Sequence, residues 1–344
     1  MSKCARNVQL DFFKIVFTIL IVIHHFLIVI DHLPYYTIRG YIAVEYFFIV
    51  SGYFMFQTSE HNKKMNTWNY LKKRLKVLYP HYIFSLFIMY LGVKQFEACK
   101  VYNIIKLIPD IFLLQSVGVF KGGGGNYPAW YMSVLITASA ILFFLHKKCS
   151  VKMYNFAAIL CVAIVYCYLF HCGKIEIWNK RYFFYIPWWR GTADLCIGTL
   201  IYQINDKLNT CLSKYIKECH IMEIVCTVVL AVCIFAEGTN LLDFIAVFSL
   251  VVLVTIMSTP YSLYKRLPPI KLSRYEYAIY LNHAFCIGIA KRVFTLSIFN
   301  NMSFEIKLML VLLTAILYSV ATTHVVEWIV RESKIRKICD KEVQ

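Results

Sequence analysis

The stretch LDFFKIVFTILIVIHH, residues 10–25, decides the fold and points to the functional site. It belongs to an apolar run from Phe12 to Ile30 that also holds two adjacent histidines, His24 and His25. As a helix rising about 1.5 Å per residue, such a run crosses the hydrocarbon core of a bilayer. Ionisable side chains are costly at that depth unless they line a cavity or find a partner. The run therefore predicts a membrane helix that carries part of a functional site.

The composition of the whole chain indicates a membrane protein. Mean hydropathy is +0.61, and only 16% of the residues are charged, whereas soluble domains hold about 25%. We predict one membrane-embedded domain, residues 1–344, folded as an all-α polytopic bundle of about ten transmembrane helices. These are expected over residues 12–30, 41–57, 77–93, 129–146, 155–171, 182–204, 220–236, 241–258, 276–297 and 306–329.

The placement of basic residues predicts the topology. With ten spans and a cytoplasmic N-terminus, 23 of the 36 Lys and Arg residues fall in cytoplasmic segments, as the positive-inside rule requires. Residues 104–120 are an eleventh candidate, but Lys106, Pro109 and Asp110 interrupt them, and an extra span would invert every later loop. We therefore predict a re-entrant or interfacial segment there. Both termini are expected in the cytoplasm, and the protein in the inner (cytoplasmic) membrane.

The net charge of +17 does not call for a nucleic-acid partner, because basic residues gather beside anionic lipid headgroups. The thirteen cysteines are scattered and form no CxxC pair. We therefore expect neither a metal site nor a disulfide framework. The first span lacks a small-residue cleavage site and is expected to be retained.

The first helix carries a charged pair at one end and the histidines toward the other. Asp11 and Lys14 are three residues apart, so they lie on one face and are expected to pair. Lys14 and His25 are separated by three turns, about 16 Å along the axis. A neutral histidine there is suited to act as a general base, or it bridges helices by a hydrogen bond. Spacing alone does not choose between these roles, or between His24 and His25.

The run YLKKRLKVLYP, residues 70–80, concentrates positive charge at the start of the third helix. Such a cluster suits the phosphates of a cytoplasmic nucleotide-containing ligand. It is equally typical of anchoring to anionic lipids. Its basic members are Lys72, Lys73, Arg74 and Lys76.

Several other predicted spans carry ionisable residues that are expected to face inward. Arg190 and Asp194 have the spacing of a helical pair. Together these residues indicate a polar interior, which fits either an enzyme cavity or a transport path. The remaining members are Glu45, His283 and Glu327.

Five blocks in this order resemble acyltransferase family 3, the integral-membrane O-acyltransferases of surface polysaccharides and related glycans. Three positions depart from the family pattern: Lys14 stands where arginine is usual, Val77 where a further arginine is common, and Leu135 where many members carry glutamate. The resemblance covers nearly the whole chain. The blocks are residues 10–25, VEYFFIVSGYF at 44–54, the basic run at 70–80, PAWYMSVL at 128–135 and YEYAIYLNH at 275–283.

The resemblance implies transfer of an acyl group, most often acetyl, from cytoplasmic acetyl-CoA to a hydroxyl of a cell-surface polysaccharide or its lipid-linked precursor. Acyl-CoA would be a substrate, with no bound cofactor, and the glycan and the lipid bilayer would be the other partners. It implies catalytic roles for His25, Lys14 and Asp11. Donor-binding roles would fall to Lys73, Arg74, Lys76 and Ser51. Further cavity candidates are His24, Glu45, Trp130, Arg190, His283 and Glu327.

A competing interpretation is a non-enzymatic exporter of a glycan or lipid, with the inward charges lining its path. The acceptor sugar, the size of the acyl group, the choice between direct transfer and an acyl-histidine intermediate, and the oligomeric state stay open at this level.

Overall fold

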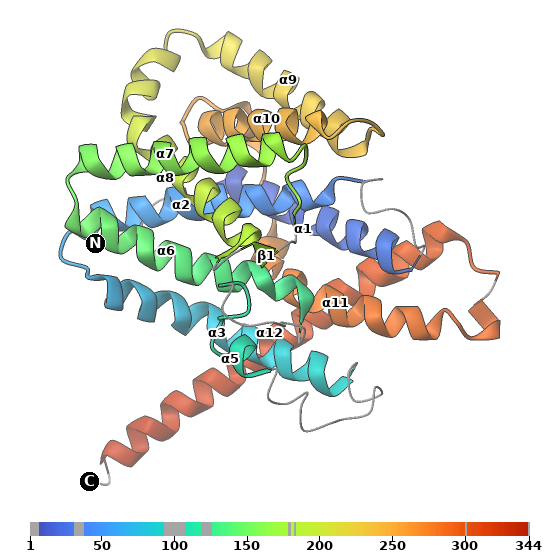
Figure 1. Cartoon of the computed structure of the whole chain (residues 1–344). Coiled ribbons are helices and arrows are strands. Elements are labelled where there is room, and N and C mark those ends of the chain that lie inside the picture. Colours follow the sequence, from blue (N-terminus) through green and yellow to red (C-terminus); the bar gives the residue numbers. More distant parts are fainter. Residues whose placement is uncertain are drawn as a thin grey trace.

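The computed structural model describes residues 7–30, 38–92, 107–117, 126–177, 180–181, 184–299 and 301–342. Helices dominate it, joined by short 3-10 turns and one antiparallel pair of two-residue strands, β1 (Lys180–Arg181) and β2 (Phe184–Tyr185) (Figure 1). The helices are α1 Val8–Val29, α2 Ala43–His61, α3 Thr67–Gly92, α5 Leu107–Ile111, α6 Trp130–Lys148, α7 Val151–His171, α8 Ile186–Leu212, α9 Ile216–Phe235, α10 Leu241–Met257, α11 Glu276–Val293 and α12 Phe304–Glu342.

Each predicted span overlaps one long helix of the described structure. By length and composition, six helical segments in the described residues are apolar enough to cross a membrane. They are α1, α3, 127–148 (α6 with the preceding 3-10 turn η3, Tyr127–Ala129), α7, α9 and 304–333 in α12. The apolar helix α10 is shorter. Helices α2, α8 and α11 are not among these six apolar segments. They carry charged groups such as Glu45, Arg190 and Glu276. The multi-pass all-helical fold is thus supported, while ten as the number of spans stays a prediction.

Lipid-facing surfaces are recognisable on the outer helices. Large apolar side chains that are at least 45% exposed lie on α7, α9 and α12. In water such surfaces would be unfavourable, whereas lipid tails cover them without cost. Examples are Phe156, Ile164, Ile221, Val228, Met309 and Leu317.

The described part of the predicted re-entrant segment contains the five-residue helix α5 followed by turns, not a spanning helix. Leu113, just after α5, has a positive φ of 59°. The hydroxyl of Ser133 donates to the Leu113 carbonyl at 2.6 Å and accepts from the Ser116 amide at 3.2 Å. Residues 104–106 and 118–120 lie outside the described residues.

Helices α2 and α8 cross in close contact because each presents a glycine. A Cβ added to Gly52 would lie 2.1 Å from the Leu195 carbonyl oxygen, and one added to Gly198 would lie 1.9 Å from the Ile49 carbonyl oxygen. Small residues allow two membrane helices to approach backbone to backbone. This crossing brings Glu45 of α2 toward Arg190 of α8.

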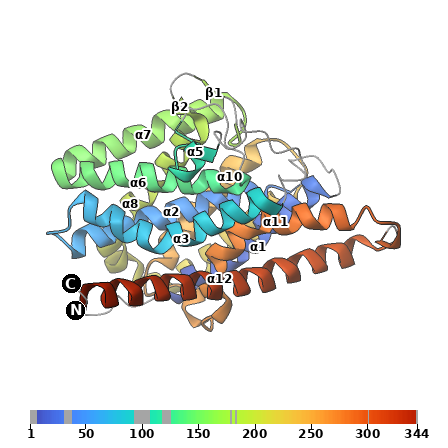
Figure 2. The ribbon, with the colours of Figure 1, turned by 90° about the horizontal axis from the view of Figure 1, so that it is seen from below.

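The segments predicted to be cytoplasmic gather at one end of the bundle, which we call the basic end. The Lys147 ammonium donates to the Ser59 carbonyl at 2.8 Å, joining the end of α6 to the end of α2. The Gln9 amide donates to the Met257 carbonyl at 2.8 Å, and the Asn205 amide contacts the Ser258 carbonyl at 3.4 Å. In Figure 2 the C-terminal ends of α2, α6 and α12 and the N-terminal end of α7 lie together on the left.

Candidate active site

His25 and His283 form a hydrogen-bonded pair between α1 and α11. The Nδ1 atom of His25 lies 3.0 Å from the Nε2 atom of His283. The two rings are stacked, with centroids 5.0 Å apart and an angle of 26° between their planes. The histidine of the first predicted span and the histidine of the last motif therefore meet, although 258 residues separate them.

The hydrogen bonds of this pair assign the protons on both rings. The Nδ1 atom of His283 lies 2.7 Å from the Tyr280 carbonyl oxygen. A carbonyl only accepts, so this Nδ1 carries the proton, and the Nε2 of a neutral His283 carries the lone pair. That lone pair accepts the Nδ1–H of His25. The Nε2 atom of His25 consequently keeps its own lone pair, as a general base requires.

His24 has different surroundings. Its Nδ1 donates to the Ile38 carbonyl at 2.7 Å, and the ring packs edge-on against Tyr41 with centroids 5.7 Å apart. A Cβ added to Gly40 would lie 2.5 Å from the His24 Cβ. His24 is therefore buried against the turn that follows α1, and its contacts are those of a residue that positions this turn.

Tyrosines cover the histidine pair. The Tyr127 ring lies 5.0 Å from that of His25 and 6.2 Å from that of His283. The hydroxyl of Tyr280 donates to the Pro128 carbonyl at 2.7 Å, which holds the turn η3 (Tyr127–Ala129) on α11. The Tyr127 side chain is itself 41% exposed. The glycine run before the turn lies outside the described residues.

A buried charged cluster joins α2 to α8. The Nε atom of Arg190 lies 3.1 Å from a Glu45 carboxylate oxygen, and both side chains are at most 1% exposed. Asp194 accepts a 2.5 Å hydrogen bond from the Tyr166 hydroxyl. The Trp130 ring stacks on the Arg190 guanidinium, 5.4 Å from its centroid. The ion pair of Arg190 is thus made with Glu45 on another helix, and not with Asp194 as its helical spacing predicted.

At the basic end, Lys14 and Asp11 form the ion pair predicted from their spacing, at 3.0 Å. The Lys14 ammonium also lies over the Phe54 ring, 5.5 Å from its centroid. Glu276, in the first turn of α11, lies within electrostatic range of both charges. Sequence reasoning missed Glu276. The available signal was its place seven residues before His283, two helical turns along the same face.

The structure divides the basic run into exposed and inward members. Lys73 and Lys76 are exposed. Arg74 is half-buried, and its guanidinium donates to the Tyr70 hydroxyl at 2.7 Å and to the Ser139 hydroxyl at 3.3 Å. The hydroxyl of Ser51 lies 3.4 Å from that of Tyr131.

Comparison with known proteins identifies the family. The sequence profile of a family described as "Acyltransferase domain" matches residues 7–328, nearly the whole chain. The chain belongs to this acyltransferase family. An amino-acid racemase of Enterococcus faecalis is 26% identical over 185 residues, which cover 48% of this chain but only 24% of the racemase. The chain therefore spans about a quarter of that protein. No solved structure matches.

One charged residue of this acyltransferase lies elsewhere than its sequence suggested, and one further ion pair is buried. Glu327, expected in the interior, forms an ion pair with Arg274 at 2.6 Å. The Glu327 side chain is 39% exposed and the Arg274 side chain 55%. Arg39, in the connection between α1 and α2, is buried and pairs with Asp243 at 2.9 Å. It also donates to the Gly238 carbonyl at 3.0 Å, which ties the turn after α1 to the connection between α9 and α10.

Proposed function

We propose that this membrane acyltransferase moves an acyl group, acetyl in the first instance, from cytoplasmic acyl-CoA to a hydroxyl of a cell-surface polysaccharide or its lipid-linked precursor. The observation that carries the proposal is the hydrogen-bonded chain from His25 through His283 to the Tyr280 carbonyl. It keeps a basic nitrogen on His25 in a helix that crosses the membrane.

In the proposed reaction, Nε2 of His25 removes the proton of the acceptor hydroxyl as the hydroxyl oxygen attacks the thioester carbonyl. The carbon–sulfur bond breaks, and the thiolate of coenzyme A leaves with the proton that His25 returns. The products are the acyl ester and the free thiol. While His25 is protonated, His283 accepts its Nδ1–H and so stabilises the cation, as the third member of a catalytic triad does.

The charges at the basic end support the assignment of the donor side. Arg74 is oriented toward the interior by Tyr70 and Ser139, while Lys73 and Lys76 remain exposed. We propose that these residues and Lys14 bind the phosphates of coenzyme A. Ser51 lies deeper, beside Tyr131. The proposed topology has ten spans with both termini in the cytoplasm, in the inner (cytoplasmic) membrane.

The activity is tested with purified protein, acyl-CoA labelled in the acyl group, and a cell-envelope glycan fraction. We expect thioester cleavage and appearance of the label in glycan as an ester released by mild alkali. The His25→Ala variant should lose both signals, whereas the exposed His61→Ala variant should keep them. A protein that moves glycan across vesicles without cleaving the thioester would instead be the exporter.

The topology is tested by labelling single cysteines with a reagent that does not cross membranes, in a background whose native cysteines are replaced. A cysteine placed between residues 121 and 126 should react in intact cells. One placed between residues 63 and 69 should react only after the cells are opened. Labelling of the second site in intact cells would reject a cytoplasmic donor site.

A further inference from the structure

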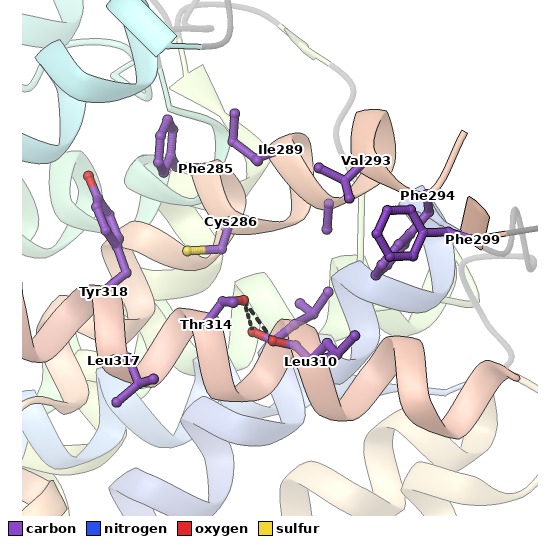
Figure 3. Close-up of a pocket in the computed structure, with 12 residues that line it drawn as sticks. Phe285, Cys286, Ile289, Val293, Phe294, Phe299, Leu310, Thr314, Leu317 and Tyr318 are labelled. Carbon is purple, nitrogen blue, oxygen red and sulfur yellow. Dashed lines mark hydrogen bonds between the residues drawn. The ribbon is translucent and has the colours of Figure 1, made fainter. Parts of the chain in front are cut away.

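A groove with apolar walls runs between α11 and α12, and neither His25 nor His283 lines it. It has a volume of about 510 Å³, the size of a small-ligand site. Figure 3 shows Phe285, Val293 and Phe294 on one wall and Leu310 and Leu317 on the other. The Thr314 hydroxyl donates to the Leu310 carbonyl of its own helix at 2.8 Å. Its polarity is thereby satisfied, and its methyl group adds to the apolar wall.

Cations lie at one end of this groove. Lys291 and Arg292 are in the last turn of α11, next to the groove residues Val293 and Phe294. Lys307, on α12, places its ammonium 5.8 Å from the centroid of the Phe294 ring. This end is opposite to the basic end, so the positive-inside rule does not account for these charges. They adjoin a groove between membrane helices, where basic residues bind lipid headgroups.

We propose that this groove binds the hydrocarbon chain of a polyisoprenyl phosphate, with the phosphate held by Lys291, Arg292 and Lys307. The inference rests on the proposed function, because such a lipid would carry the glycan acceptor. Charge complementarity selects a phosphate-bearing headgroup, and the apolar lining suits a hydrocarbon chain.

The groove also lies close to the proposed chemistry. Cys286, which lines it, is one helical turn after His283 on α11. Lys291 follows His283 by eight residues, about 12 Å along the helix axis. A lipid bound here would therefore hold its headgroup at the end of the helix that supplies half of the histidine pair.

Binding is measured by native mass spectrometry of the purified full-length protein with a long-chain polyisoprenyl phosphate. We expect saturable binding that the uncharged polyisoprenol and inorganic phosphate do not reproduce. Replacing two cations, Lys291→Gln with Lys307→Gln, should weaken binding about 30-fold, since each cation contributes about a factor of five. The matched control, Lys214→Gln with Lys217→Gln, removes two exposed lysines at the basic end and should leave binding unchanged.

The apolar part is tested by filling the groove. Thr314→Trp places a large ring inside it and should weaken binding at least as much as the double charge change. Leu313→Trp is the control, because Leu313 is 51% exposed and does not line the groove. Equal loss in both tryptophan variants, or equal binding of the polyisoprenol, would overturn the proposal. The proposal would also be overturned by a groove variant that still binds the lipid but changes from a dimer to a monomer, because the groove would then bind a second copy of the chain.

The binding measurement separates this proposal from the proposed function. The His25→Ala protein should bind the polyisoprenyl phosphate as the wild type does, because His25 does not line the groove. Normal lipid binding without any acyl transfer by the wild type would reject the proposed function alone. Acyl transfer without lipid binding would reject the groove proposal alone.

Discussion

The two ends of α1 stabilise their polar groups in different ways. Near the basic end, the Lys14 ammonium lies 3.0 Å from the Asp11 carboxylate, and the Lys14 side chain is 23% exposed. The two charges thus form a partly exposed ion pair. Toward the other end, His25 is held by the neutral ring of His283, which itself donates to a backbone carbonyl. Charged side chains such as Lys14 are suited to bind the charged acyl-CoA. A chain of neutral hydrogen-bond donors and acceptors, such as the one at His25, is suited to accept and return a proton.

Of the two ends of α1, the end with His25 should show the largest effect of a substitution. We expect His25→Ala to lower glycan acylation about 10²-fold or more, because a group that transfers the proton is removed. His24→Ala should be milder, since His24 holds the turn at Ile38. Acylation is measured as alkali-labile acyl ester in cells with matched membrane levels of each variant. The reverse ranking would mean that His24 is the base.

His283 should show the next largest effect. His283→Ala removes the acceptor of the His25 Nδ1–H, and a hydrogen bond to a charged group is worth about 1.5–3 kcal/mol. We expect kcat to fall about 10- to 100-fold with little change in KM for the acyl-CoA. His283→Gln offers an amide oxygen as acceptor and should restore part of the rate. A change confined to KM would place His283 in binding and not beside the proton.

Lys14 tests the charged end of the helix. Lys14→Ala should lower kcat/KM for the acyl-CoA about tenfold, because Asp11 and Glu276 are left without their cation. Lys14→Arg should retain activity, since arginine keeps the positive charge and the N–H groups that pair with Asp11. The two variants are compared by thioester cleavage at equal protein. Full activity of Lys14→Ala would remove this ion pair from the site.

The smallest effects are expected in the basic run, and they should be unequal. Arg74→Ala should raise KM for the acyl-CoA more than Lys73→Ala does, because Arg74 is oriented inward by Tyr70 and Ser139. The loss at exposed Lys73 should stay below about fivefold. The wild-type KM should rise with salt as the Debye length shrinks, and the variant that carries both Lys73→Ala and Arg74→Ala should show less of this rise. Equal changes at both positions would contradict the orientation of Arg74.

Sequence patterns predicted the helices well, but they could not say which charges meet. The spacing of Asp11 and Lys14 predicted their pair because both residues are on one helix, where geometry is regular. The same reasoning failed for Arg190, whose carboxylate partner is Glu45 on α2, and the sequence alone offered no partner for Arg39, which is buried against Asp243. The close approach of α2 and α8 at Gly52 and Gly198, 146 residues apart, decides the first of these.

By itself, the sequence determined a multi-pass helical membrane protein of an acyltransferase family, because hydrophobic run length and motif order are properties of local stretches of chain. It also marked His25 and His283 as ionisable groups in apolar surroundings. Only the tertiary structure decided that these two histidines meet and which ring nitrogens carry their protons. A tautomer depends on the acceptor that faces it, and here α11 supplies that acceptor to α1 from 258 residues away.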